Sequence, residues 1–244
     1  MNVYIMLRRI AGALFVLSLL VLFGTLSLRW MVSDLGWYQT NFEQNRISER
    51  TGIPASELSR SASQISRYLL LDRDGLDDLS VTARGEARPL FNDREKLHLG
   101  HVRDLLRGFY LSQVVAVGYV LLYLVAGRLL ARRGFRRILG RELRWAGVLT
   151  LAAFGAFGLV SMLSFDELFL QFHVASFQGD CWLFDPATDN LVAMFPQNFW
   201  NDSALRLAAL TAAQAVGSVL VGTLLLTTSS RTGNRLPGRV TPVG

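Results

Sequence analysis

Four long apolar blocks dominate the pattern of hydrophobic and polar positions along this chain. They cover residues 10–28, 109–127, 146–163 and 205–227. Each is close in length to the ~20 residues that an α-helix needs to cross ~30 Å of hydrocarbon. None contains an acidic residue or a lysine, and Arg206 lies near the end of its block, where its side chain can reach the membrane surface. We therefore predict an all-α membrane protein with four transmembrane helices.

The first block is preceded by basic residues, as a signal peptide would be. It is longer than the apolar core of most signal peptides, and no small-residue cleavage site follows it. Instead Arg29, Trp30, Trp37 and Tyr38 follow, in the manner of an interfacial belt. We predict an uncleaved membrane anchor.

Arginines are concentrated in the segments that would share one side of the membrane. Seven lie between the second and third blocks and five more lie near the chain ends, against the single acid Glu142. All other acidic residues fall in the two remaining loops. The positive-inside rule then places both termini in the cytoplasm and both long loops outside. The formal net charge of +6 is explained by this topology and indicates no nucleic-acid partner.

These signals divide the chain into alternating membrane and outer segments, with a small mixed extracytoplasmic cap. The predicted segments are the cytoplasmic N-terminus with the first helix (1–28), the first part of the cap (29–106), the second helix (107–127), an arginine-rich cytoplasmic loop (128–144), the third helix (145–163), the second part of the cap (164–204), the fourth helix (205–227) and a disordered cytoplasmic tail (228–244).

The first cap segment has local signals for regular structure. Pro54 begins a pattern of apolar residues spaced for one helix face, namely Leu58, Ala62, Ile65 and Leu69. The stretch LSVTARGEARPLF predicts a short strand and turn. Asn92 followed three residues later by Glu95 predicts a capping box, and hence a helix that continues into the second span.

In the second cap segment, FDELFLQFHVASF predicts a helical extension of the third span. WLFDPATDNLVAMF predicts a hairpin of two apolar strands, in which Asp185 and Asp189 belong to the turn. Asp202 or Ser203 is expected to cap the fourth span, with Phe199 and Trp200 at the membrane interface. The single cysteine, Cys181, permits no intrachain disulfide, so we expect packing to hold the cap together.

All three histidines of the chain, His98, His101 and His173, are predicted at one depth, where cap meets bundle. The simplest interpretation is solvated or capping side chains. A three-histidine metal site is another, although the spacing of the first two is unusual for ligands. An ion pathway is disfavoured because no ionisable residue lies within the apolar blocks. The remaining interpretation is an acid–base pair of two histidines, one from each cap segment.

Polar and aromatic neighbours extend this candidate site. Glu95 either completes the cap or orients His98 from three residues before, and Arg94 shares a helix face with His98. Aromatic residues surround His173 in the sequence and suggest a water-poor pocket for a lipid-like substrate. The predicted supporting or substrate-binding residues are Phe91, Asn92, Arg94, Glu95, His101, Phe169, Phe172, Trp182, Asp185 and Trp200.

Two stretches carry a family resemblance. LFNDREKLHLGHVRDL and FHVASFQGDCWLFDPATDNLVAMFPQNFWND resemble the two signature regions of the bacterial lipoprotein intramolecular transacylase family. The resemblance implies that His98 and His173 are catalytic. The sequence departs from the family pattern at His101, where an acidic residue is expected.

The resemblance also implies the reaction. The sn-2 acyl chain of a diacylglyceryl-cysteine lipoprotein would move to the α-amine of the same N-terminal cysteine, giving a lyso-form lipoprotein. Ester-to-amide transfer is downhill, so neither cofactor nor metal is expected. The expected partners are a diacylated lipoprotein and membrane lipid, with the protein a monomer in the bacterial cytoplasmic membrane. The alternatives are a non-catalytic membrane protein whose cap binds lipid or peptide, and a metal-dependent membrane enzyme that uses the three histidines.

Overall fold

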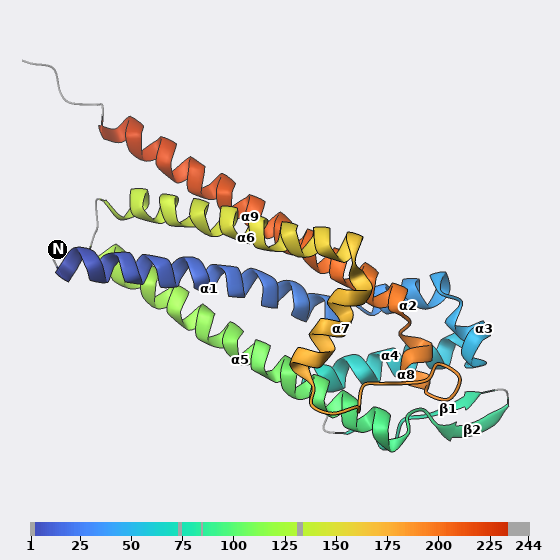
Figure 1. The fold of residues 1–244 in the computed structure, drawn as a ribbon. Coiled ribbons are helices and arrows are strands. Elements are labelled where there is room, and N and C mark those ends of the chain that lie inside the picture. Colours follow the sequence, from blue (N-terminus) through green and yellow to red (C-terminus); the bar gives the residue numbers. More distant parts are fainter. Residues whose placement is uncertain (1–2, 73–74, 84, 131–133, 234–244) are drawn as a thin grey trace, which may run out of the picture. The chain divides into compact units, whose positions relative to one another are not determined.

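The chain is mainly helical (Figure 1) in this computed structural model, which describes residues 3–72, 75–83, 85–130 and 134–233. The elements in chain order are α1 (Val3–Ser33), α2 (Leu35–Gln44), α3 (Ile47–Thr51), α4 (Ala55–Leu69), β1 (Ser80–Ala83), β2 (Glu86–Pro89), α5 (Asp93–Leu130), α6 (Phe135–Leu163), α7 (Phe165–Ser176), α8 (Asn190–Met194) and α9 (Gln197–Gly233).

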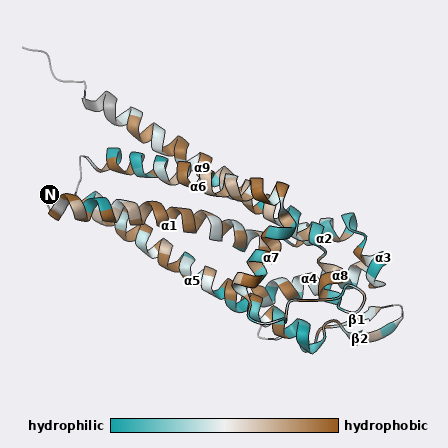
Figure 2. Cartoon of the chain, in the orientation of Figure 1, coloured by the Kyte–Doolittle hydropathy of each residue, from teal (hydrophilic) through white to brown (hydrophobic). Residues whose placement is uncertain are grey.

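The four predicted transmembrane helices are confirmed. Apolar windows in α1, α5, α6 and α9 have mean hydropathies between 1.8 and 2.3, and each helix is long enough to cross a membrane. Figure 2 shows hydrophobic residues along these helices and more hydrophilic ones on the short elements. In α5 the apolar stretch is 109–127, and the preceding turns carry charged residues. Those first turns therefore belong to the cap and not to the hydrocarbon-spanning part.

The structure divides into two units that combine distant parts of the sequence. The first unit comprises residues 1–23, 115–153 and 211–244, and the second comprises residues 24–114 and 154–210. The prediction of a disordered tail from residue 228 is wrong for residues 228–233, because α9 continues to Gly233. Residues 234–244 of that tail lie outside the described residues.

Aromatic stacking and close helix approach hold the first unit together. Phe15 is 1% exposed and stacks on Tyr123 with ring centroids 4.6 Å apart. A Cβ added to Gly147 would lie 2.5 Å from the carbonyl oxygen of Ala215, so α6 and α9 touch through their backbones. Small residues at such contacts are typical of membrane helices. Glu142, predicted as an isolated cytoplasmic acid, is buried and accepts a hydrogen bond from the Tyr123 hydroxyl at 2.5 Å.

The second unit has its own apolar core beneath the cap helices. The predicted stripe of α4 is confirmed, since Leu58, Ala62, Ile65 and Leu69 are all buried. The predicted strand and turn are present as the antiparallel pair β1–β2. The largest wholly buried apolar side chains of this unit are Ile47, Ile53, Leu58, Ile65, Leu90, Phe91 and Met194.

Two aromatic residues expected at the membrane interface belong to this core instead. Tyr38 is 6% exposed and Phe199 is 5% exposed, and their rings lie 5.9 Å apart against Phe195. Arg206, expected to reach toward lipid headgroups, pairs with Asp34 at 2.5 Å and lies over the Trp37 ring. Burying these aromatic rings in the cap core stabilises the protein more than placing them at the membrane interface would.

The predicted hairpin in the second cap segment is wrong. Residues 182–189 form turns and irregular backbone, and α8 follows. The Asp189 carboxylate accepts the N–H of Asp185 at 2.8 Å, and the Glu95 carboxylate accepts the N–H of Leu191 at 2.6 Å. These side chains occupy backbone donors that a strand ladder would need.

Two predicted helix boundaries also differ. The stretch after the third span is helical, but Ser164 has φ −151° and separates α7 from α6. The helix that contains the fourth span begins at Gln197, immediately after Pro196, rather than at Asp202 or Ser203. The Ser203 hydroxyl instead accepts a hydrogen bond from Trp37 Nε1 at 3.1 Å.

Candidate active site

The N-terminus of α5 is fixed by the predicted capping box. The Asn92 side chain accepts the Glu95 N–H at 3.0 Å, and the Glu95 carboxylate accepts the Asn92 N–H at 2.7 Å. This reciprocal pair satisfies donors that would otherwise be unpaired at the first turn. It therefore sets the start of the helix that carries His98.

Glu95 and Asn92 also bind the second cap segment. Glu95 is 1% exposed and takes the Leu191 N–H as well. Asp189 accepts hydrogen bonds from the Asn92 amide at 2.8 Å and from the Arg94 guanidinium at 3.0 Å. Side chains of one cap segment thus hold the backbone of the other, and with it the loop that follows α7.

This arrangement brings His98 of α5 and His173 of α7 together. Their rings stack at 19°, with centroids 6.0 Å apart. They are 6% and 8% exposed, so both are buried. The prediction that one histidine from each cap segment faces the other agrees with this geometry.

The hydrogen bonds of the two histidines differ. His173 Nδ1 lies 2.8 Å from the Phe169 carbonyl oxygen, which can only accept, so this nitrogen carries the hydrogen. Neutral His173 therefore has its lone pair on Nε2. The buried Nδ1 of His98 has no hydrogen-bond partner within the described part of the chain. A protein hydrogen bond thus fixes the tautomer of His173, whereas no partner at Nδ1 fixes that of His98.

Burial disfavours the charged form of both imidazoles. Burial, followed by the neighbouring charges of His173 and His101, lowers the pKa of His98 from 6.5 to about 4. Burial also lowers the pKa of His173, while the hydrogen bond to Phe169 works in the opposite direction. Neutral imidazole is the form that accepts a proton.

Aromatic rings line the histidine pair on several sides. Phe177 and Phe184 lie 4.9 and 5.4 Å from the His98 ring, measured between centroids. Phe169 and Trp182 lie 4.1 and 5.1 Å from the His173 ring. Such walls exclude water and strengthen electrostatic interactions inside the site.

The third histidine makes a different contact. His101 Nδ1 lies 3.4 Å from the Cys181 sulfur, and neither residue is fully buried. No group of three potential metal ligands is placed to share an ion among the residues that the structure describes. His98 and His173 therefore contact each other, whereas His101 contacts Cys181.

The remaining predicted residues divide between the site and its surroundings. Phe172 lies edge-on to His173 at 5.4 Å, and Trp200 lies 6.2 Å from Phe169. Phe91 is 2% exposed and belongs to the cap core. Asp185 caps its own turn by accepting the Ala187 N–H at 2.9 Å, as the turn prediction expected.

Sequence reasoning treated Asp189 as a turn former only. Asp189 is 5% exposed, and its partners Asn92 and Arg94 stand more than ninety residues away. Nothing local distinguishes it from Asp185. The predicted site did not include Phe177 or Phe184. Phe177 follows His173 by four residues, and this spacing was the signal that could have selected it.

Comparison with known proteins agrees with the two signature stretches. The family model of the lipoprotein intramolecular transacylase Lit matches residues 13–200. This chain belongs to that family. An uncharacterized protein from Aquifex aeolicus is 24% identical over 185 residues, which cover 76% of this chain and 77% of that protein.

Solved structures of the Lit transacylase from Bacillus cereus share the fold. One matches with a TM-score of 0.79 at 18% identity and covers 92% of this chain and 98% of that one. A variant with one histidine replaced by alanine matches with a TM-score of 0.73 at 18% identity and covers 95% of this chain and 100% of that one. The membrane-integral, multi-pass architecture is thus common to the Lit fold and to this chain.

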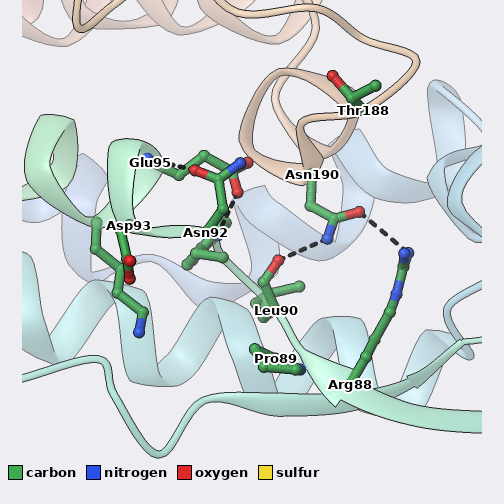
Figure 3. A pocket seen from close by; sticks show the side chains of 10 residues that line it. Arg88, Pro89, Leu90, Asn92, Asp93, Glu95, Thr188 and Asn190 are labelled. Atoms are coloured by element: carbon green, nitrogen blue, oxygen red, sulfur yellow. Dashed lines mark hydrogen bonds between the residues drawn. The ribbon is translucent and has the colours of Figure 1, made fainter.

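A pocket of about 380 Å³ lies beside the capping box of this Lit family member (Figure 3). The Asn190 amide donates to the Leu90 carbonyl at 2.6 Å, and Arg88 donates to Asn190 at 3.3 Å. Neither histidine of the stacked pair lines it. Its lining residues are Arg88, Pro89, Leu90, Phe91, Asn92, Asp93, Glu95, Lys96, Thr188 and Asn190.

Proposed function

We propose that this acyltransferase of the Lit family moves the sn-2 acyl chain of a diacylglyceryl-cysteine lipoprotein to the α-amine of the same cysteine. His98 and His173 act as its acid–base pair. The observation that carries this proposal is the stacking of two buried histidines at 6.0 Å within an aromatic enclosure. No cofactor or metal takes part, and the protein acts as a monomer in contact with membrane lipid.

His173 is the proposed base for the amine. An N-terminal α-amine with a pKa near ~8 reacts as the free amine, after its ammonium form has released one proton to solvent. His173 takes the further proton that the nitrogen loses as the C–N bond forms. The Phe169 carbonyl holds the hydrogen on Nδ1 of His173, so Nε2 presents its lone pair to the substrate. The same imidazole, once protonated, returns the proton to the glyceryl oxygen as the ester bond breaks. Proton balance is then complete without a second acid.

His98 is the proposed hydrogen-bond donor to the developing oxyanion. The sequence alone suggested an imidazolium in this role. A pKa of about 4 leaves His98 neutral at physiological pH, so it donates an N–H hydrogen bond rather than a proton. Its Nδ1 is buried and lacks a partner among described residues, so Nε2 is assigned as the N–H that meets the oxyanion. A preorganised donor in a water-poor site stabilises the transition state by ~3 kcal/mol.

The membrane orientation follows from the arginine distribution. Both termini are cytoplasmic, and the cap that holds the histidines is extracytoplasmic. The site then lies at headgroup depth, where a lipoprotein presents its ester and its amine on one molecule. Holding the two groups together contributes on the scale of ~7–11 kcal/mol for ideally placed intramolecular reactions. The aromatic walls exclude the water that would otherwise hydrolyse the ester.

Mass spectrometry of a diacyl lipoprotein co-expressed with the protein tests the proposal. The wild type should convert the substrate to the N-acyl, lyso-glyceryl form of identical mass, which fragmentation distinguishes. His98→Ala and His173→Ala should lower conversion by at least ~100-fold, on the scale of a lost general base or oxyanion donor. His101→Ala is the matched control from the same helix and should retain most activity.

Three outcomes would contradict parts of this proposal. No acyl migration by the wild type rejects the transacylase. Loss of activity in His101→Ala alone rejects the assigned pair. Activity of the purified protein that a chelator removes and Zn²⁺ restores would show that a metal takes part.

A further inference from the structure

The β1–β2 pair has one occupied edge and one open edge. The Leu90 N–H donates to the Leu79 carbonyl at 2.8 Å, which fixes which residues of the pair exchange hydrogen bonds. Ladder bonds alternate in an antiparallel pair, so the N–H and C=O groups of Thr82 and Ala87 point away from the partner strand. The outer edges of the two strands can therefore be compared directly.

Side chains of α4 cover the outer edge of β1. The Thr82 N–H donates to the Glu57 carboxylate at 2.5 Å, and the Ser80 carbonyl accepts from Arg60 at 2.9 Å. The outer edge of β2 has no such cover. All four β2 residues are exposed, and the outward groups of Ala87 and Pro89 have no partner in the described part of the chain. An open edge of this kind is a template for another strand.

Cavities accompany this open edge. The pocket of about 380 Å³ begins at Arg88 and Pro89, has the wholly buried Leu90 in its wall, and reaches Glu95 (Figure 3). A second cavity of about 270 Å³ is lined by Glu86 and Arg88 of the same strand. Side chains of an added strand would have space on one face of β2.

The pocket also connects the strand to the candidate active site. Glu95 forms part of its wall, and His98 follows three residues later on α5. That separation is one helical turn, about 4.5 Å along the axis. Extended polypeptide advances ~3.3 Å per residue, so a few residues would lead from the histidine pair into the pocket and along β2.

We propose that the outer edge of β2 and the adjoining pocket bind the extended peptide that follows the lipidated cysteine of the substrate, as an added strand. This inference rests on the proposed transacylase function. An extended polypeptide is the ligand whose alternating N–H and C=O groups match the open edge. Lipid is a poor occupant, because Glu86 and Arg88 are charged and exposed. Main-chain pairing would accept lipoproteins that differ in sequence after the cysteine.

Binding of unreactive ligands tests this site independently of catalysis. The probes are dialkylglyceryl-cysteine peptides, whose ether-linked chains cannot be transferred, with either one or eight Ser/Ala/Asn residues after the cysteine. The protein is full length and in lipid nanodiscs. The wild type should bind the long peptide at least fivefold more tightly than the short one.

Ala87→Pro removes the outward N–H of β2 and should abolish that difference, while the Kd of the short ligand stays unchanged. Proline is tolerated where a strand edge faces solvent. Ser80→Ala is the matched control, since it changes an exposed side chain of β1, whose outer edge α4 covers, and leaves the outward backbone groups of β2 intact. If Ala87→Pro does not fold, long peptides N-methylated at alternate residues replace it. Methylation in one register should then weaken binding, and methylation in the other should not.

Equal binding of long and short ligands by the wild type would overturn the peptide site. So would an equal loss for both ligands in Ala87→Pro. The corresponding ester-linked substrate distinguishes this failure from failure of the proposed function. Conversion without length-dependent binding overturns only the peptide site, and length-dependent binding without conversion overturns only the transacylase.

Discussion

The carboxylate of Glu95 accepts the backbone N–H of Leu191 at 2.6 Å, and this bond joins the helix that carries His98 to the segment that follows His173. The same carboxylate caps its own helix through Asn92. Glu95 is 1% exposed, so neither bond is weakened by solvent. The position of the two histidines thus depends on a residue that touches neither of them in any contact described above.

Glu95→Gln should therefore lower both stability and activity. Glutamine keeps one acceptor oxygen and adds donors, so one buried N–H loses its partner at a cost of ~1–3 kcal/mol. The melting temperature of the purified protein and the conversion of a diacyl lipoprotein measure the two effects. Asp93→Asn, at an exposed neighbouring acid, is the control. Equal behaviour of the two variants would show that the Leu191 contact does not hold the site.

Asp189→Ala should destabilise the cap more than Asp185→Ala. Burial works to raise the pKa of Asp189, but hydrogen bonds from the Asp185 N–H, Asn92 and Arg94 outweigh it and lower that pKa. Removing the carboxylate takes the acceptor away from these three donors, at a cost of ~2 kcal/mol. The cost is limited because the Arg94 side chain is half-exposed and can bind water instead. The difference in melting temperature between the variants is the measurement. A larger loss in Asp185→Ala would contradict the assignment of Asp189 as the common acceptor.

Acid should destabilise the protein through His98. Its pKa is 6.5 when unfolded and about 4 when folded, so between these values the unfolded chain binds a proton that the folded chain does not. The stabilisation is fully present above pH 6.5 and is lost as the pH falls toward 4, by on the order of 3 kcal/mol. Melting temperatures recorded from pH 7.5 to 4.5 measure this loss. His98→Gln should flatten the profile in this window, and an unchanged profile would contradict the prediction.

Gly147→Ala should loosen the membrane bundle. Its added Cβ would lie 2.5 Å from the Ala215 carbonyl oxygen and from a Val219 methyl group, closer than atoms can approach. Gly118→Ala is the matched control, because a Cβ at that helical position meets nothing within 4 Å. Steric overlap at a tight helix contact costs ~1–3 kcal/mol. Melting in detergent should show a drop for the first variant only, and equal melting temperatures would argue against backbone contact between α6 and α9.

Local patterns in the sequence were sufficient for much of this protein. Four spans follow from uninterrupted apolar length, since hydrocarbon imposes that length on any helix that crosses it. The stripe of α4 and the Asn92–Glu95 cap depend on residues only three or four positions apart. The two histidines could be placed at one depth because each adjoins the end of a predicted span.

Tertiary structure alone decided how the two cap segments meet. Asp189 resembled a turn residue until Asn92 and Arg94 were brought to it across the fold. The predicted hairpin did not form because the Asp189 carboxylate of the same segment and the distant Glu95 carboxylate took its backbone donors.

Position in the sequence likewise did not distinguish His98 from His101. Packing against His173 buries the first, and contact with Cys181 engages the second. The sequence by itself determined where the four spans form and where histidines occur. The tertiary structure determined which of those histidines lose water and face each other, because burial and hydrogen bonding depend on neighbours that are remote along the chain.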